Sequence, residues 1–497
     1  MTDAGYNAYA YGLATSGVYP TAAPTTVAPT SANLTLYQDP GCGTFNGGDN
    51  GEYGPILNPA GQCRFNSVAF SNLAEDEHRY QIFSEFNHDF ADGSKLHLEA
   101  LFARTAAGYT TTPSFPPPNV SLQYQPAANP GVQDYITWLN LNGRAADAAL
   151  ISANGIRYNG RLFGPGITGR STIHGTRVYE TNRLAGAYTG TFESGWLKDV
   201  DYDFHITWSR SEASGVGADD IYIDRARLAL LGLGGPNCDP ATGTPGVGNC
   251  QWLSTFSTAQ PGSVLDPNIN NPAYNPATGL GYHAQPNTNT PELVNWLFGP
   301  GLESTFTNEL TVAEAVFSGQ LGWALGGGNA SYAVGAQLRA ERYQSDPSNI
   351  NNVLLNPCTI EGDVTCGTSA GVFQFNPPFL PVTDSRLVEA VFGELQLPIT
   401  DKLSMQVALR YESFPGATGD TLDPKIQVRY EPTEWLVLRG SAQTAFRAPT
   451  LNQLSDVSTT QTPFVGSVYI PFDTLGNPAL TPETSFSYNL GAIVDFR

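Results

Sequence analysis

The residues best suited to acid–base or metal chemistry are scattered along this sequence. The histidines show no H-E-x-x-H spacing, and neither a G-x-S-x-G nucleophile elbow nor a Walker phosphate loop occurs. A hydrolase built from serine and histidine on neighbouring strands is the enzymatic alternative, but only residue types support it. We therefore expect no enzyme and no catalytic residue; His88 is predicted to be interfacial. The histidines are His78, His88, His97, His174, His205 and His283.

The six cysteines fall into three pairs that are close in sequence, each inside a stretch rich in Gly, Pro and Asn. A zinc site needs ligands paired at short spacing, and no C-x-x-C occurs, so we expect no metal and no cofactor. Closeness in sequence favours three loop disulfides among the possible connectivities. Such bridges persist outside the reducing cytosol. The predicted pairs are Cys42 with Cys63, Cys238 with Cys250, and Cys358 with Cys366.

The composition narrows the class of protein. The chain has 497 residues, of which 41% are hydrophobic and 14% charged, with 52 glycines and 37 prolines. A net charge of −21 argues against nucleic-acid binding, which needs clustered Lys and Arg. No apolar run is long enough for a membrane helix, whereas a membrane β-barrel hides its apolar residues in alternation. The remaining candidates are therefore built from strands.

The stretch from Asp423 to Asp456 shows how such strands are arranged. Apolar and polar residues alternate from Lys425 to Tyr430, and after a short break alternation resumes from Leu436 to Arg447. Alternation of this kind gives a strand one apolar face and one polar face. The second run is long enough to cross a bilayer when tilted. The stretch is thus predicted to be a hairpin of a membrane wall.

Similar hairpins recur along the chain. Five hairpins and a lone last strand give about eleven strands, with short connections inside hairpins and long ones between them. Outer-membrane barrels have this asymmetry, with short periplasmic turns and long extracellular loops, whereas a propeller or solenoid has more even connections. The expected strands lie within residues 80–102, 184–208, 310–338, 387–411, 426–446 and 486–496.

The long loops are expected to carry short helices. Asn129 as N-cap, Pro130 at the first helical position and Gly143 after the end bracket a helix at Gln133–Asn142. Two further helices are predicted at Ile221–Leu231 after Asp220, and at Pro291–Phe298 between Thr290 and Gly299. The fold class expected is therefore all-β, a partial transmembrane antiparallel barrel with long extracellular loops that carry short helices.

Two motifs give the chain a family resemblance. Phe446-Arg447-Ala448-Pro449-Thr450-Leu451-Asn452-Gln453-Leu454 follows a strand, and Gly476-Asn477-Pro478-Ala479-Leu480-Thr481-Pro482-Glu483-Thr484 follows in turn. In this order they resemble the barrel signature of TonB-dependent outer-membrane receptors. The resemblance covers the barrel alone, and we find no counterpart of the family's plug or TonB box. We expect residues 1–74 to be an extracellular loop piece and 75–497 an incomplete receptor barrel.

The resemblance implies energised uptake across the outer membrane of a Gram-negative bacterium. A scarce nutrient, such as a ferric siderophore, cobalamin, carbohydrate or peptide, would bind at the loops, and TonB would act through a plug outside this chain. A passive channel or an adhesin built on a barrel is the alternative. The eleventh strand lacks a partner, and large receptors have about twenty-two strands. We therefore expect an open, curved sheet belonging to a larger protein.

Parity assigns the faces of the strands. The lumen-facing candidates are Arg439, Gln443 and Arg447, and the odd-numbered residues of 201–209 are expected to face the lumen while the even-numbered ones face lipid. Arg447 could contact plug or ligand at the mouth of the lumen. The favoured interpretation is that it is a strand-end residue, because Pro449 removes a ladder donor.

Overall fold

The computed structural model describes most of the chain. The described residues are 7–11, 34–38, 55–57, 63–65, 72–111, 114, 124–159, 174–256, 289–301, 303–366, 370–376, 378–455, 458–461, 464–465, 468–469 and 472–495.

One large antiparallel sheet of eleven strands forms the wall of the molecule. Most of its strands are long enough to cross a hydrocarbon layer at a tilt. The strands are β5 (Glu77–Asp89), β6 (Lys95–Thr110), β9 (His174–Thr191), β10 (Asp201–Val216), β13 (Glu303–Leu325), β14 (Gly328–Pro347), β15 (Val382–Thr400), β16 (Leu403–Ser413), β17 (Asp420–Thr433), β18 (Leu436–Arg447) and β23 (Glu483–Val494).

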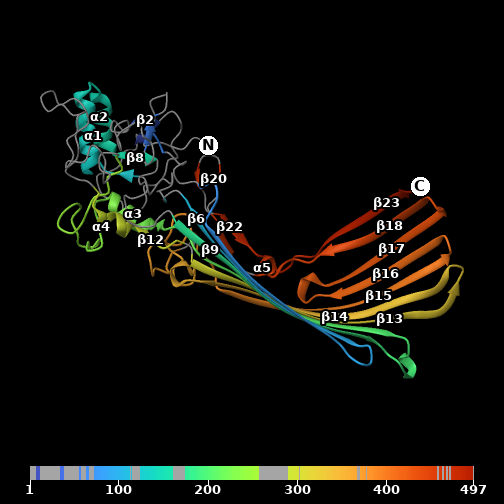
Figure 1. Cartoon of the computed structure of the whole chain (residues 1–497). Coiled ribbons are helices and arrows are strands. Elements are labelled where there is room, and N and C mark those ends of the chain that lie inside the picture. Colours follow the sequence, from blue (N-terminus) through green and yellow to red (C-terminus); the bar gives the residue numbers. More distant parts are fainter. Residues whose placement is uncertain are drawn as a thin grey trace.

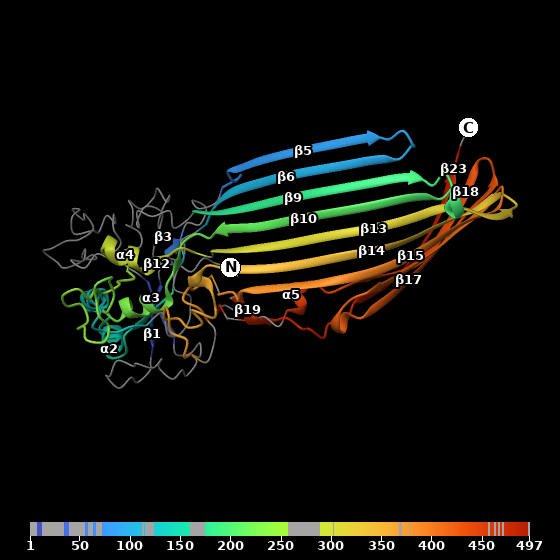
Figure 2. The same cartoon turned by 90° about the horizontal axis from the view of Figure 1, so that it is seen from below.

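Each strand of this sheet pairs with its neighbours in chain order, from β5 at one edge to β23 at the other. Figures 1 and 2 show the sheet curving strongly without its edges meeting. Within the described residues the two edge strands do not pair with each other. The predicted number of strands and the predicted open, curved sheet are therefore confirmed.

The strands of the wall are longer than their hydrophobic pattern suggests. The expected strand region ended at residue 208, but β10 continues to Val216 and pairs with β13 as far as Glu303. The hairpin of β13 and β14 likewise runs on to Pro347. Above the apolar region both faces carry polar side chains, so alternation fades while the backbone ladder continues. Hydrogen bonding, rather than the hydrophobic pattern, sets these strand ends.

A smaller globular region lies beyond one end of the sheet, on the side of the long connections, and is built from short elements (Figure 1). Its four-stranded sheet has the order β2-β1-β8-β7, and β11 pairs with β12. The elements are β1 (Asn7–Tyr11), β2 (Leu34–Gln38), β7 (Tyr124–Gln125), α1 (Pro130–Leu141), α2 (Ala145–Asn154), β8 (Ile156–Asn159), β11 (Asp220–Ile221), α3 (Ile223–Leu230), α4 (Pro291–Leu297) and β12 (Phe298–Gly299). We call this region the cap.

The remaining strands are short, and in the described residues three single-turn 3-10 helices, η3 (Gly195–Leu197), η5 (Asn349–Asn351) and η6 (Gly416–Thr418), lie between strands of the wall. The short strands form two-stranded pairs, β3 with β4, β19 with β22, and β20 with β21. One short helix, α5, follows β18. Their bounds are β3 (Pro55–Leu57), β4 (Cys63–Phe65), α5 (Leu451–Leu454), β19 (Ser458–Gln461), β20 (Phe464–Val465), β21 (Val468–Tyr469) and β22 (Phe472–Leu475).

Two of the three predicted helices are present in the cap with the N-cap residues that were predicted for them. Asn129 caps α1 by accepting a hydrogen bond from the Gly131 N–H, and Thr290 caps α4 by accepting one from Leu293. The third prediction was wrong about its start, because Asp220 lies in β11 and α3 begins at Ile223 without a side-chain cap. Helix α2 was not predicted. Its start, after Arg144, has no side-chain N-cap, so the sequence lacks the usual signal.

Two apolar clusters hold the cap together. One joins α1 and α2 around Tyr135 and Ile151, with Phe256 packed against them, and the other joins α3, α4 and β12 around Leu230 and Leu297. Each apolar side chain buried in this way contributes about 1.5–3 kcal/mol to folding. None of the helices in the described residues combines the length and apolar character that a membrane crossing requires.

Candidate functional site

The concave face of the sheet carries a cluster of charged side chains on three neighbouring strands. We call it the inner cluster; it consists of Arg339 and Glu341 of β14, Arg386 of β15, and Arg410 and Glu412 of β16. Within each strand the members are two residues apart, and side chains of a strand alternate between faces, so all five emerge on one face. Cross-strand register, Arg339 with Val388 and Ala390 with Glu412, keeps the face continuous.

Salt bridges connect the members of the inner cluster. Arg339 lies 2.7 Å from Glu341 and 3.2 Å from Glu412, between the charged N and O atoms. Arg410 lies 2.5 Å from the other oxygen of Glu412, and Arg386 lies 2.7 Å from Glu341. Each carboxylate therefore bridges two guanidinium groups. The side chain of Glu412 is only 6% exposed, so its charge depends on these partners.

Amide and aromatic groups complete the surroundings of the inner cluster. Gln337 accepts hydrogen bonds from Arg339 and Arg410 and donates one to Glu314 at 2.6 Å. The buried ring of Phe414 lies under the guanidinium groups of Arg339 and Arg386, whose centres are 5.7 and 5.3 Å from the ring centroid. Three guanidinium groups thus face three carboxylates, counting Glu314, and the cluster is balanced in charge. This arrangement favours rigidity over strong attraction of an anion.

The motif that follows β18 packs onto the inner cluster. Arg386 donates a hydrogen bond of 2.7 Å to the carbonyl oxygen of Pro449, and Phe446 meets Phe414 edge to face with ring centroids 5.7 Å apart. Helix α5 then contacts β14 and β15. Figure 1 shows α5 inside the curve of the sheet. We call residues 446–455 the strap.

The strap is shaped by its own sequence. Thr450 and Gln453 form a capping box at the start of α5, in which each side chain bonds the other's backbone. Pro449, which is buried, cannot donate to a ladder, so β18 ends at Arg447.

The structure places the three lumen-facing candidates on one strand, β18. Register pairs Gln443 with Lys425 and Arg439 with Arg429, in phase with the concave face of β17. Arg447 is the last residue of the strand, and its guanidinium lies 3.8 Å from the carboxylate of Glu483. The three do not join the inner cluster. The strand ends at Arg447, as the favoured interpretation expected.

Sequence reasoning missed the inner cluster itself. Its arginines and glutamates are ordinary alternating polar residues of three predicted strands, and no local motif marks them. Only the relative register of β14, β15 and β16 brings them together. A sequence signal did exist for the strap, because the motif around Pro449 was recognised, although its contact with Arg386 was not predicted.

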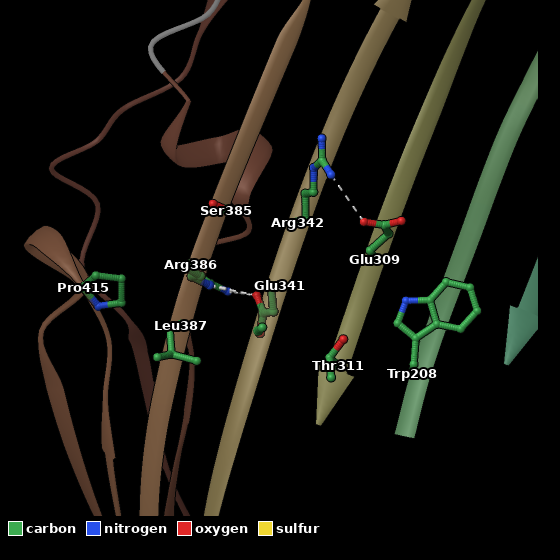
Figure 3. Close-up of a pocket in the computed structure, with 10 residues that line it drawn as sticks. Trp208, Glu309, Thr311, Glu341, Arg342, Ser385, Arg386, Leu387 and Pro415 are labelled. Carbon is green, nitrogen blue, oxygen red and sulfur yellow. Dashed lines mark hydrogen bonds and ion pairs between the residues drawn. The ribbon is translucent and has the colours of Figure 1, made fainter. Parts of the chain in front are cut away.

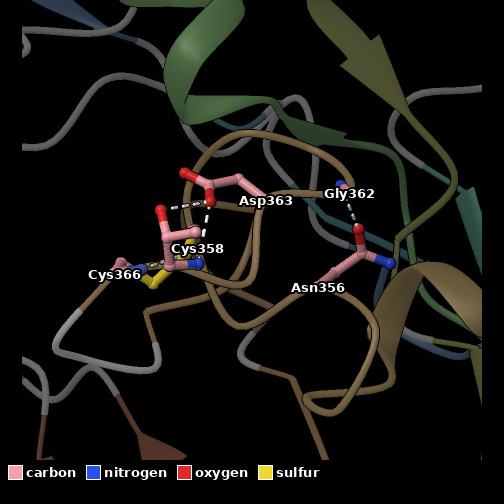
Figure 4. The surroundings of a disulfide bond; sticks show 6 residues. Asn356, Cys358, Gly362, Asp363 and Cys366 are labelled. Atoms are coloured by element: carbon pink, nitrogen blue, oxygen red, sulfur yellow. Dashed lines mark hydrogen bonds between the residues drawn. A yellow bond between two sulfur atoms is a disulfide. The ribbon is translucent and has the colours of Figure 1, made fainter.

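Two of the predicted cysteine pairs are disulfides in the structure. Cys238 is bonded to Cys250, and Cys358 to Cys366. Figure 4 shows the second bridge closing a tight loop, and Asn356, just before this loop, accepts a hydrogen bond from the Gly362 N–H within it. The pair Cys42 and Cys63 lies outside the residues whose side chains the structure describes. Within the described residues, no three His, Cys, Asp or Glu side chains are grouped as a metal site would need.

A buried carboxylate ties loops together in the cap. Asp220 accepts hydrogen bonds from the backbone N–H groups of Ile221, Phe375 and Asn376 and from the hydroxyl of Ser114. Burial raises the pKa of the Asp220 carboxyl, and these hydrogen bonds oppose the increase. The sequence predicts Asp220 only as a helix cap. The side chain instead connects segments more than one hundred residues apart.

The family comparison bears on the strands that carry the inner cluster and the strap. Residues 288–497 match the family model described as TonB dependent receptor-like, beta-barrel. This part of the chain is therefore similar to the barrel of TonB-dependent receptors. The match begins just before α4 and includes β13 to β23, hence every residue of the inner cluster. No curated protein matches the sequence.

Solved structures of siderophore, ferric enterobactin and hemophore receptors resemble most of the chain at low identity. The siderophore receptor PirA from Acinetobacter baumannii is 11% identical with a TM-score of 0.43, over 87% of this chain and 42% of that one. The ferric enterobactin receptor PfeA from Pseudomonas aeruginosa is 11% identical with a TM-score of 0.33, over 88% and 52%. The hemophore receptor HasR from Serratia marcescens is 10% identical with a TM-score of 0.41, over 86% and 43%. The chain thus spans about half the length of these receptors.

Proposed function

We propose that this chain is part of the wall and loops of an outer-membrane receptor that takes up a scarce nutrient with energy from TonB. The family match of residues 288–497 carries the proposal. Strands β5 to β10 lie outside the match, but β10 pairs with β13 over sixteen residue pairs, from Asp201–Ser318 to Val216–Glu303. The unmatched strands therefore continue the same wall.

The proposed location is the outer membrane of a Gram-negative bacterium, with the cap outside the cell. The convex face supports this location, since it exposes large apolar side chains along several strands. In water such a surface would be costly, whereas in lipid it is the favourable arrangement. Examples are Phe204 and Ile206 on β10, Leu338 on β14, Val391 on β15 and Leu422 on β17.

The proposed lumen lies along the concave face. We assign Arg439, Gln443 and Arg447 to it, together with the inner cluster. The partners of the complete receptor would be membrane lipid, the nutrient and the TonB complex acting through a plug. The nutrient could be a ferric siderophore, a cobalamin, a carbohydrate or a peptide.

Uptake experiments test the proposal. The gene is deleted from its host, and growth of the deletion strain is measured with one limiting nutrient at a time. The same set of nutrients is then tested in a strain that lacks TonB. We expect loss of uptake of one nutrient in both strains and recovery when the gene is restored to the strain that has TonB. Uptake that depends on the gene but continues without TonB would contradict the proposal and indicate a passive channel. Loss of surface attachment with normal uptake would indicate an adhesin.

A further inference from the structure

A groove on the convex face of the sheet lies where its apolar rows give way to charge. It has a volume of about 570 Å³ and is bordered by β10, β13, β14 and β15. Figure 3 shows its labelled side chains, with Trp208 at one side and Pro415 at the other. Register places Trp208, Thr311, Ala340 and Leu387 in one row across the four strands.

The next row of the convex face toward the cap carries three charged side chains and one serine. It consists of Arg210, Glu309, Arg342 and Ser385, which are paired in register across the same strands. On the other side of the Trp208 row the convex face continues with Ile206 and Leu338, both more than half exposed, and this row ends in the exposed Glu389 on β15. The groove therefore lies across a boundary between apolar and charged surface. An amphiphile with a charged head and apolar chains matches this order of rows.

The arginine in this groove is not saturated by the protein. Arg342 lies 3.7 Å from Glu309 and is half exposed. In the part of the chain that the structure describes, Arg342 has no closer acidic partner and donates no hydrogen bond. Arg386, one strand away on the other face, is 9% exposed and held by Glu341 and Pro449. A planar guanidinium with free donors is well suited to a phosphate group.

We propose that the groove binds a phosphate-bearing lipid of the surrounding membrane. The phosphate accepts hydrogen bonds from Arg342, and the acyl chains lie along Trp208 and Leu387 and then along Ile206 and Leu338 of the next row. Glu309 competes with the phosphate for Arg342 and lowers the affinity. This inference rests on the proposed membrane location, but it does not depend on transport or on TonB.

The test measures lipid bound to the full chain, purified from membranes in a mild detergent, by native mass spectrometry. The probes are lipid A carrying its phosphomonoesters and the same lipid A after dephosphorylation. We expect the phosphorylated form to bind about tenfold more tightly to the unaltered protein, a difference of ~1.4 kcal/mol. Inorganic phosphate at millimolar concentration should compete weakly, since it lacks acyl chains. Equal binding of the two lipids would overturn the proposal, as would inorganic phosphate binding as tightly as the lipid.

Two substitutions should change the preference for the phosphorylated lipid in opposite directions. Arg342→Gln should remove most of the preference for the phosphorylated lipid, whereas Glu309→Gln should increase it, because the guanidinium is released and a repelling carboxylate is lost. Arg429→Gln is the matched control; Arg429 lies on β17, in phase with the concave face, and should not alter lipid binding. Binding that is abolished by EDTA but unchanged in Arg342→Gln would indicate a divalent cation held by Glu309 and would refute the role of Arg342. Normal nutrient uptake by a protein that does not prefer the phosphorylated lipid would refute the lipid-binding inference and leave the proposed function unaffected.

Discussion

Arg386 joins two segments of the chain that lie 63 residues apart, through the hydrogen bond from its Nη1 to the carbonyl oxygen of Pro449. Its other guanidinium nitrogens bind Glu341 of the neighbouring strand. The side chain therefore connects the inner cluster to the strap. Because it is 9% exposed, water cannot easily replace either partner.

We predict that Arg386→Ala loosens the strap without unfolding the sheet. The substitution removes a charge-assisted hydrogen bond, which contributes about 1.5–3 kcal/mol, and leaves the Pro449 carbonyl without this partner. The backbone N–H groups of Leu454 and Ser455, which are bonded within α5, should exchange with deuterium faster. Arg386→Lys should give an intermediate result, because an ammonium lacks the planar fork that spans both partners. Unchanged exchange in Arg386→Ala would show that α5 is held by other contacts.

Glu412→Gln should destabilise the sheet strongly. Glu412 neutralises both Arg339 and Arg410, and removing one partner of a buried ion pair costs about 3–5 kcal/mol. Folded and unfolded forms of the protein migrate differently in electrophoresis. Heating samples to a series of temperatures and measuring the fraction that still migrates as the folded form gives the midpoint of thermal unfolding. Glu483→Gln is the matched control, since Glu483 is 77% exposed and 3.8 Å from Arg447, and pairs of this kind contribute little. A similar midpoint for both variants would contradict the structural importance of the inner cluster.

The sheet was largely predictable from the sequence, and the inner cluster was not. Alternation along each strand is a local pattern, so the strands around Ile426 and Leu438 could be recognised residue by residue. The ends of β10 and β14 could not, because hydrogen bonding continues where the apolar pattern stops. The contact of Arg339 with Glu412 depends on the register of two strand pairs, β14 with β15 and β15 with β16. Cross-strand register is weakly encoded by local residues unless a turn or a buried face fixes it.

In the cap, too, local signals could be predicted from the sequence and long-range contacts could not. Helices α1 and α4 were predictable because Asn129 and Thr290 are conventional N-cap residues. Helix α2 has no side-chain cap, and Asp220 bonds to Phe375 and Ser114, which are far from it in sequence. Long-range hydrogen bonds of this kind leave no periodic signal.

We predict that mass spectrometry of the intact protein, with and without reductant, will show three disulfides and a difference of six hydrogen masses. The structure contains two of these bridges, and the pairing of Cys42 with Cys63 stays a prediction. Cys358→Ser combined with Cys366→Ser should destabilise the loop of β14 and β15 by about 2–3 kcal/mol, because the bridge closes a short loop. Limited proteolysis between residues 358 and 366 measures this. A thiol that reacts with iodoacetamide without prior reduction would contradict the prediction of three bridges.

The last prediction concerns the pH dependence of the cap. Because burial raises the pKa of Asp220 above its ordinary value of 3.8, the folded cap holds this proton more tightly than the unfolded chain does. Between 3.8 and the raised pKa the folded state therefore binds more protons, and the free energy of unfolding falls as pH increases through that interval.

Asp220→Asn separates this effect from the hydrogen bonds. Asparagine does not titrate, so the part of the pH dependence that belongs to Asp220 should disappear. It has one acceptor oxygen instead of two, so at least one of the N–H groups of Ile221, Phe375 and Asn376 would lose its acceptor, at a cost of about 1–3 kcal/mol. Thermal unfolding followed by tryptophan fluorescence, which reports on Trp296 beside the α3–α4 cluster, measures both changes. Asp363→Asn is the control, because Asp363 bonds only within its own loop in the described residues and its hydrogen bonds with Thr365 lower its pKa, so any linkage it contributes has the opposite sign. A pH profile that is the same for Asp220→Asn and the unaltered protein would show that the proton linkage lies elsewhere.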